Sequence, residues 1–218
     1  MKIAILGATG PSGLQLVQES LERGHEVKAL VRTPDKLGHI SDPKLKVEKV
    51  DIFSEDDLSQ HFSGCDVIMS CLGTVPSLFG WNTITFYQDT IKPLVSAMRK
   101  SGNSRLVAMT ALDTIPQSRG PWIFEWVIRP VILSSVLQSM SVMEEYLQQQ
   151  CTDLDYTVVK PPGLTDQPSS GKEVKAAEGQ YVEGAIRKIP RRDVAKFMLD
   201  CIPRTEWVRK LVAIGLPV

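Results

Sequence analysis

The sequence lacks several features that mark large classes of protein. Its 25 basic residues are balanced by 25 acidic ones, so it has no positive excess of the kind that polyanion-binding proteins usually carry. Its four cysteines, at positions 65, 71, 151 and 201, do not have the paired spacing of a zinc site and are typical of reduced thiols. We therefore expect no nucleic acid partner, no metal centre and a cytoplasmic location.

Long uncharged apolar runs are also absent. The most apolar stretch extends from Trp122 to Val142, but Glu125, Arg129 and Pro130 interrupt it. Since a membrane helix needs about 20 consecutive apolar residues, we expect no membrane span. The stretch is either a buried helix after a loop or a lid that faces lipid or a partner. Met1 leads directly into an apolar segment, which predicts that no signal or transit peptide precedes the domain.

Apolar, β-rich segments alternate with helical patterns along the 218 residues. Strands are predicted at residues 2–6, 26–32, 45–50, 67–72, 105–110, 155–159 and 211–214. Helices are predicted at residues 11–23, 55–62, 83–100, 131–150 and 191–201. Strands that are apolar on both faces and separated by helices predict an α/β protein with a doubly wound parallel sheet, a Rossmann fold. We expect one domain, 1–218, in which residues 161–190 form a small irregular lobe on the substrate side.

A glycine-rich turn, Gly7-Ala-Thr-Gly-Pro-Ser-Gly13, links the first predicted strand to the first predicted helix. In this context glycines allow a tight turn and a close approach of backbone to ligand, and the helix start presents free N–H groups. Pro11 suits the first helical turn, where its missing N–H costs nothing. The turn therefore predicts a pyrophosphate site.

Residues that follow the next strands extend this predicted site. Arg32 stands at a strand end where NAD-specific sheets usually carry an acid, and Lys36 follows, which favours NADPH/NADP because a cation matches a 2′-phosphate. Alternatively, Arg32 is a solvated strand end. Asp51 and Ile52 either face an adenine or form an ordinary turn and cap. Gly73, with Thr74, either lies against the cofactor ribose or makes a plain turn.

Several motifs together resemble the atypical short-chain dehydrogenases, and within them the NADPH-dependent flavin reductase (biliverdin reductase B) group. They are G-A-T-G-P-S-G, A-L-V-R-T, V-D-I-F, C-L-G-T, V-V-K-P-P-G-L-T-D-Q-P and R-R-D-V-A-K-F-M-L, and the resemblance extends almost end to end. The regulatory NmrA-like proteins share the fold. The resemblance implies an NADPH site at Gly7, Thr9, Gly10, Ser12, Gly13, Arg32, Lys36, Asp51, Ile52, Leu72 and Gly73. It also implies a substrate pocket beside the nicotinamide, near Tyr87, Met109, Thr110, Ala111, Pro162, Gly163 and Leu164.

The chain departs from this group beside the expected nicotinamide. Ala111 stands where the group has a serine, and Gly163 where it has a histidine. Tyr156-Thr-Val-Val-Lys160 matches the Tyr-x-x-x-Lys pattern of other short-chain dehydrogenases, but its β-branched residues and the prolines that follow predict a strand. On a strand the two side chains lie about 13 Å apart, too far for the catalytic pair. Thr110 is then the nearest polar group; it either orients water for proton transfer or bonds backbone at the strand end.

The sequence thus favours an NADPH-dependent reductase of flavins, biliverdin-like tetrapyrroles or other planar acceptors such as quinones, acting as a monomer or weak homodimer. The alternative is a non-catalytic NADP(H) sensor of the NmrA-like type that binds a protein partner. A third interpretation, an epimerase or dehydratase, has less support because the tyrosine–lysine pair is absent.

Overall fold

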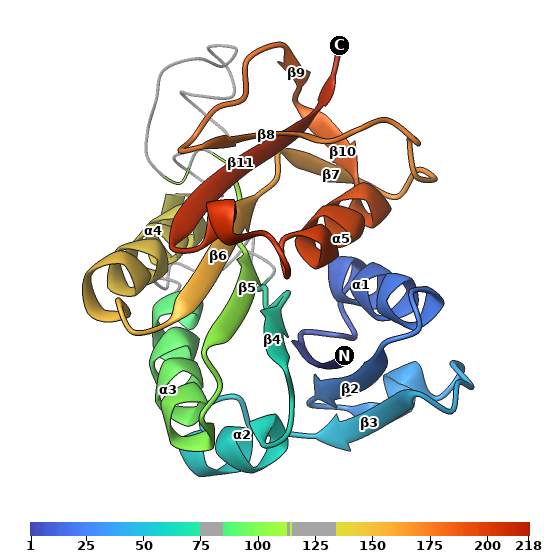
Figure 1. Cartoon of the computed structure of the whole chain (residues 1–218), viewed down its shortest axis with the longest axis vertical. Coiled ribbons are helices and arrows are strands. Elements are labelled where there is room, and N and C mark those ends of the chain that lie inside the picture. Colours follow the sequence, from blue (N-terminus) through green and yellow to red (C-terminus); the bar gives the residue numbers. More distant parts are fainter. Residues whose placement is uncertain (75–84, 113, 115–133) are drawn as a thin grey trace.

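A parallel sheet forms the centre of the molecule (Figure 1). The computed structural model describes residues 1–74, 85–112, 114 and 134–218. Seven strands make up the parallel part: β1 (Lys2–Leu6), β2 (Glu26–Val31), β3 (Leu45–Lys49), β4 (Val67–Ser70), β5 (Arg105–Met109), β6 (Asp155–Lys160) and β11 (Lys210–Pro217). Their order is β3-β2-β1-β4-β5-β6-β11, which confirms the predicted doubly wound sheet.

Helices cover both faces of this sheet, as the figure shows. They are α1 (Pro11–Glu22), α2 (Glu55–Phe62), α3 (Phe86–Ser101), α4 (Ser134–Gln150) and α5 (Arg191–Asp200). Helices α1 and α5 pack over one core, while α2, α3 and α4 pack over the other. The strands contribute alternate residues to the two cores, so Ile3 and Ile5 face the first and Ala4 and Leu6 the second.

Local signals place the helix starts and ends. Pro11 occupies the first turn of α1, and the Ser54 hydroxyl accepts a hydrogen bond from the Asp57 backbone N–H at 3.2 Å, which caps α2. Helix α3 ends at Gly102, whose φ of +76° is a left-handed conformation that favours glycine. The helix predicted at 131–150 begins at Ser134 in the described part of the chain. Residues 115–133, which include most of the apolar stretch that starts at Trp122, lie outside the described residues.

The segment 161–190 is more regular than we expect from its sequence. It contains β7 (Gly163–Thr165), β8 (Lys175–Glu178), β9 (Ala185–Ile186) and β10 (Lys188–Pro190). Strands β7 and β10 pair with each other, whereas β8 and β9 pair antiparallel with β11 and extend the central sheet. These strands of two to four residues are too short to show a period in the sequence, and their partners lie 25 or more residues away.

The strand order fixes where a ligand can bind. Strands β2 and β4 lie on opposite sides of β1, so the connections that leave β1 and β4 diverge at their carboxyl ends. Such a switch point opens a crevice in doubly wound sheets. The residues that follow β1, β2, β4, β5 and β6 therefore meet at one edge. No helix in the described ranges is long and apolar enough to cross a membrane.

Candidate functional site

The turn after β1 is built on glycines that no other residue could replace without movement. Gly7 has a φ of +73°, and a Cβ there would lie 2.5 Å from the carbonyl oxygen of Cys71. A Cβ on Gly13 would lie 2.1 Å from the carbonyl oxygen of Gly7. The Gly10 N–H donates to that same Gly7 oxygen at 3.0 Å and closes the turn. The backbone therefore packs tightly against both β4 and the first turn of α1.

The start of α1 has free donors. The first intrahelical bond runs from the Leu14 N–H to the Gly10 carbonyl at 2.8 Å, so the Ser12 and Gly13 amides precede the bonded part of the helix. No side-chain hydrogen bond caps this end among the described residues. Thr9 and Pro11 are exposed beside it. This arrangement suits a pyrophosphate, which would accept from the free amides and sit at the positive end of the helix dipole.

Two exposed cations lie beyond β2. Arg32 follows the strand directly, and Lys36 belongs to the short 3-10 helix η1 (Pro34–Leu37). Within the described part of the chain, neither side chain forms an ion pair or a hydrogen bond, so both can bind an external anion. An arginine and a lysine on one turn fit a phosphate monoester.

Asp51 is held within its own turn. Its Oδ1 accepts from the Phe53 backbone N–H at 3.0 Å, and its own N–H donates to Asp57 Oδ2 at 2.8 Å. One oxygen of this exposed carboxylate is therefore used within an ordinary turn, as the second interpretation predicts. Ile52 is partly buried against the second core. Binding of adenine by Asp51 and Ile52 stays a prediction.

Tyr87 stands at the beginning of α3 with its hydroxyl at the end of β4. The ring is buried, and burial raises the pKa of the phenol although a hydrogen bond to the Thr74 backbone partly offsets this effect. A Cβ on Gly73 would meet the Tyr87 hydroxyl at 3.5 Å, an ordinary contact. Since the described protein atoms do not require a glycine there, its role in cofactor approach stays a prediction.

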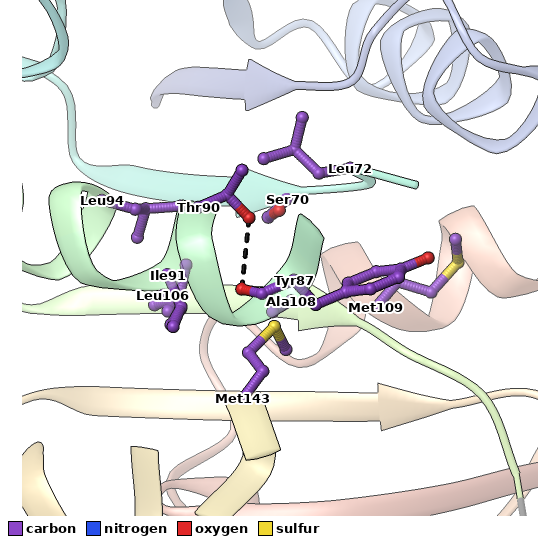
Figure 2. A pocket seen from close by; sticks show the side chains of 10 residues that line it. All are labelled: Ser70, Leu72, Tyr87, Thr90, Ile91, Leu94, Leu106, Ala108, Met109 and Met143. Carbon is purple, nitrogen blue, oxygen red and sulfur yellow. Dashed lines mark hydrogen bonds between the residues drawn. The ribbon is translucent and has the colours of Figure 1, made fainter. Parts of the chain in front are cut away.

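A mostly apolar pocket extends from the ends of β4 and β5 beneath α3 (Figure 2). It brings together Leu72, Tyr87 and Met109, which the sequence predicts for the cofactor or substrate side, with Met143 from α4. The remaining lining residues are Ser70, Thr90, Ile91, Leu94, Leu106 and Ala108. Its free volume is about 10 Å³, roughly the space of one water molecule, so these residues form a packed apolar surface beside the ligand edge and not a cavity for a ligand.

The other predicted substrate residues lie on neighbouring backbone. The Leu112 N–H donates to the Pro161 carbonyl at 2.9 Å, so Ala111 and Pro162 flank one cross-link between the segment after β5 and the end of β6. Gly163 is exposed at the start of β7, and Leu164 packs against the first core. These residues do not line the pocket of Figure 2.

Lys160 closes β6, which confirms that the Tyr-x-x-x-Lys pattern lies on a strand. Its ammonium is fully buried and donates to both oxygens of Glu144, at 2.7 and 2.6 Å. The Thr110 hydroxyl donates to Glu144 Oε1 at 2.6 Å, and the Thr114 hydroxyl donates to Oε2 at 2.9 Å. Thr110 therefore bonds a carboxylate through its side chain, while its backbone N–H donates to the Val159 carbonyl.

Sequence reasoning missed this cluster, although a signal existed. Glu144 follows Met140 by four residues and precedes Leu147 by three, so it falls on the buried face of α4. Lys160 ends a strand in which the three preceding residues, Thr157, Val158 and Val159, are all β-branched. An acid on an apolar helix face and a lysine closing a buried strand are compatible only if they pair. No group of three or more potential metal ligands occurs among the described residues.

Comparison with known proteins finds relatives and solved structures that match most of this chain. A chloroplastic protein of Arabidopsis thaliana without an assigned function is 27% identical over 98% of this chain and 76% of its own length. A protein of Aspergillus fumigatus named as an oxidoreductase is 26% identical over 82% of this chain and 71% of its own. A wide-type short-chain dehydrogenase/reductase of Veillonella parvula, solved in complex with NADP, superposes with a TM-score of 0.75 at 17% identity, covering 99% of this chain and 94% of its own.

A family model described as NAD(P)H-binding matches residues 7–205, which span the glycine turn, the two cations, the pocket and the Glu144–Lys160 pair. The residues of the turn and the helix start fit the phosphates of such a cofactor. The chain therefore belongs to the NAD(P)H-binding family.

Proposed function

We propose that the protein is an NADPH-dependent oxidoreductase that reduces planar acceptors such as flavins, biliverdin-like tetrapyrroles or quinones. The observation that carries this proposal is the presence of two exposed cations, Arg32 and Lys36, on the same sheet edge as the glycine turn; neither forms an ion pair with another described residue. A pyrophosphate site and a phosphate-binding pair at this edge fit a 2′-phosphorylated dinucleotide better than NADH. The names of the Aspergillus relative and of the Veillonella structure support the same class.

When bound, the cofactor supplies a hydride, so the protein need only bind, orient and exclude water. Ser12 and Gly13 present amides to the pyrophosphate, and Arg32 with Lys36 binds the 2′-phosphate. The apolar walls formed by Leu72 and Met109 keep water from the reacting face. Orientation of this kind supplies a large part of the rate in hydride transfer.

The proton that completes the reduction comes from water in this proposal. Thr110 directs its only hydroxyl hydrogen to Glu144, so it can accept a hydrogen bond from water but does not point a proton at a substrate. Ala111 and Gly163 have no side-chain donor. The Tyr87 hydroxyl lies at the Thr74 backbone, and burial raises its pKa, which makes it a weaker proton donor.

The experiment mixes purified protein and NADPH with FMN, riboflavin, biliverdin or menadione and follows the loss of nicotinamide absorbance. We expect turnover with at least one of these acceptors, and slower turnover with NADH at equal concentration. An Arg32→Asp variant serves as the matched control, because it should lose the preference for NADPH while it keeps the pocket. Absence of turnover across all four acceptors would contradict the proposal.

A second candidate is a non-catalytic NADP(H) sensor that binds a protein partner. The lack of side-chain donors at Ala111 and Gly163 favours it. Calorimetry separates the two candidates: a sensor binds NADPH tightly, oxidises none with the four acceptors, and changes its affinity for a partner when the nucleotide binds.

A further inference from the structure

Four polar side chains form a buried cluster next to the pocket. Lys160, Glu144, Thr110 and Thr114 are 0%, 2%, 4% and 5% exposed. The Glu144 carboxylate accepts four hydrogen bonds, two from Lys160 and one from each threonine. A buried ion pair of this kind often adds little net stability compared with apolar residues of similar volume, so stability alone does not explain it.

The cluster ties one short segment to two rigid elements. Thr110 and Thr114 lie in the segment after β5, Glu144 lies on α4, and Lys160 ends β6. Both threonine hydroxyls use their only hydrogen on Glu144, one on each oxygen. Each end of the segment is therefore held by the same carboxylate, and Lys160 in turn fixes that carboxylate.

Backbone bonds add to the same connection. The Thr110 N–H donates to Val159 and the Leu112 N–H donates to Pro161, at 3.0 and 2.9 Å. The Gln180 amide contacts the Thr114 hydroxyl at 3.4 Å and links the segment to the connection after β8.

Helix α4 connects the cluster to the pocket. Met143, adjacent to Glu144, lines the pocket with Met109 and Tyr87 (Figure 2). One turn earlier, the Ser139 hydroxyl accepts a hydrogen bond from the Tyr87 backbone N–H at 3.1 Å. One helix thus holds the backbone of Tyr87, contributes a pocket wall and holds Thr110.

We propose that Glu144 and Lys160 are positioning residues that fix Thr110, Leu112 and Thr114, at the ligand-binding edge of the sheet, as part of the wall of the substrate site. This proposal rests on the proposed reductase function, because it assigns the pair a part in placing the acceptor. The pair acts through Thr110 and Thr114 and does not itself touch the acceptor. The Thr110 oxygen is thereby kept as a hydrogen-bond acceptor at the end of β5.

The decisive variant is the double substitution Glu144→Gln with Lys160→Met. It removes both charges at once, so it avoids the unpaired buried charge that would destabilise either single variant. Glu145→Gln is the matched control, since Glu145 is the exposed neighbour on the same helix. Three quantities are measured for each protein: amide hydrogen exchange at Leu112 and Val107, NADPH affinity by fluorescence, and kcat and KM with the best acceptor of the panel.

In the double variant we expect exchange at Leu112 to accelerate about tenfold or more, while Val107 in the centre of β5 keeps its protection. We expect kcat to fall about tenfold or more because the reacting groups are misplaced, while NADPH affinity changes less than about twofold. The Glu145→Gln protein should match the wild type in all three. A merely structural pair would instead change the protection of Leu112 and Val107 together and leave kcat unchanged in the folded protein.

The outcomes separate this proposal from the proposed function. Unchanged exchange at Leu112, or full kcat despite faster exchange, overturns the positioning role. If the wild type reduces none of the acceptors, the reductase function fails. In that case the affinity of the NADP-bound protein for FMN, measured by flavin fluorescence, replaces kcat. Weaker FMN binding in the double variant supports the positioning role, and equal binding overturns it.

Discussion

Removal of the Lys160 ammonium alone tests the energetics of the buried pair. In Lys160→Met the thioether fills a similar volume, but the Glu144 carboxylate, with a side chain 3% exposed, loses the cation that bonds both of its oxygens. Thr110 and Thr114 still donate to it, yet neither carries charge. Loss of one partner of a buried pair costs about 3–5 kcal/mol. Since each kcal/mol shifts Tm by about 2–4 °C at this chain length, we expect a fall of roughly 6–20 °C.

The assay is thermal unfolding monitored by circular dichroism, with Lys210→Met as the matched control. Lys210 pairs with Glu178 at 2.8 Å, but the two side chains are 39% and 59% exposed. Such a surface pair contributes about 0–1 kcal/mol, so its loss should leave the unfolding midpoint almost unchanged. If Lys160→Met costs no more than Lys210→Met, the reasoning about the buried charge is refuted. If the Glu144→Gln, Lys160→Met double variant is less stable than Lys160→Met, the same conclusion follows.

Two other predictions concern the glycine turn and the thiols. Gly13→Ala should abolish NADPH binding, because its Cβ would lie 2.1 Å from the Gly7 oxygen and displace the turn. Calorimetric binding within threefold of wild type would contradict this. Gly171→Ala is the control for glycine loss far from the turn: its Cβ would meet no atom within 4 Å, and its φ of +68° confines the strain to the local backbone. Burial raises the pKa of Cys71 and of Cys201 to about 12, so the native protein should show little reaction of either thiol with a disulfide reagent at pH 8, against full reaction after denaturation. Because the ordinary thiol value is 9.0, these two groups stabilise the folded protein fully below pH 9, and the free energy of unfolding should fall as pH rises towards 12. A rising free energy across that window would contradict the assignment.

The parallel sheet could be predicted because local signals and long-range packing agree. Lys2–Leu6 and Glu55–Phe62 have the predicted bounds, since a following glycine turn marks the end of one and a Ser54 cap marks the start of the other. The strand predicted at 26–32 ends one residue earlier, at Val31, and leaves Arg32 exposed for a ligand. The signals that place the cofactor turn are thus short-range: a strand, a glycine spacing and a helix start.

The remaining features depend on contacts that no short window contains. The pairing of β7 with β10 joins Gly163 to Lys188, and the pairing of β8 with β11 joins Lys175 to Gly215. The Thr110–Glu144–Lys160 cluster joins three elements, and the residue types of each element alone have ordinary interpretations. The sequence predicts Thr110 as a strand-end polar group, but its carboxylate partner lies 34 residues along the chain. The sequence alone does not show which of these distant positions pair.

We propose that Arg32 binds the 2′-phosphate of a dinucleotide held by the Gly7–Gly13 turn, and equilibrium titration with NADPH and NADH measures that contact. Each charge-assisted hydrogen bond contributes about 1.5–3 kcal/mol, so Arg32→Asp should weaken NADPH binding about 100-fold or more. NADH, which lacks the phosphate, should change less than about threefold or bind more tightly through its ribose hydroxyl. Equal weakening of both nucleotides, or no change in either, would contradict the claim.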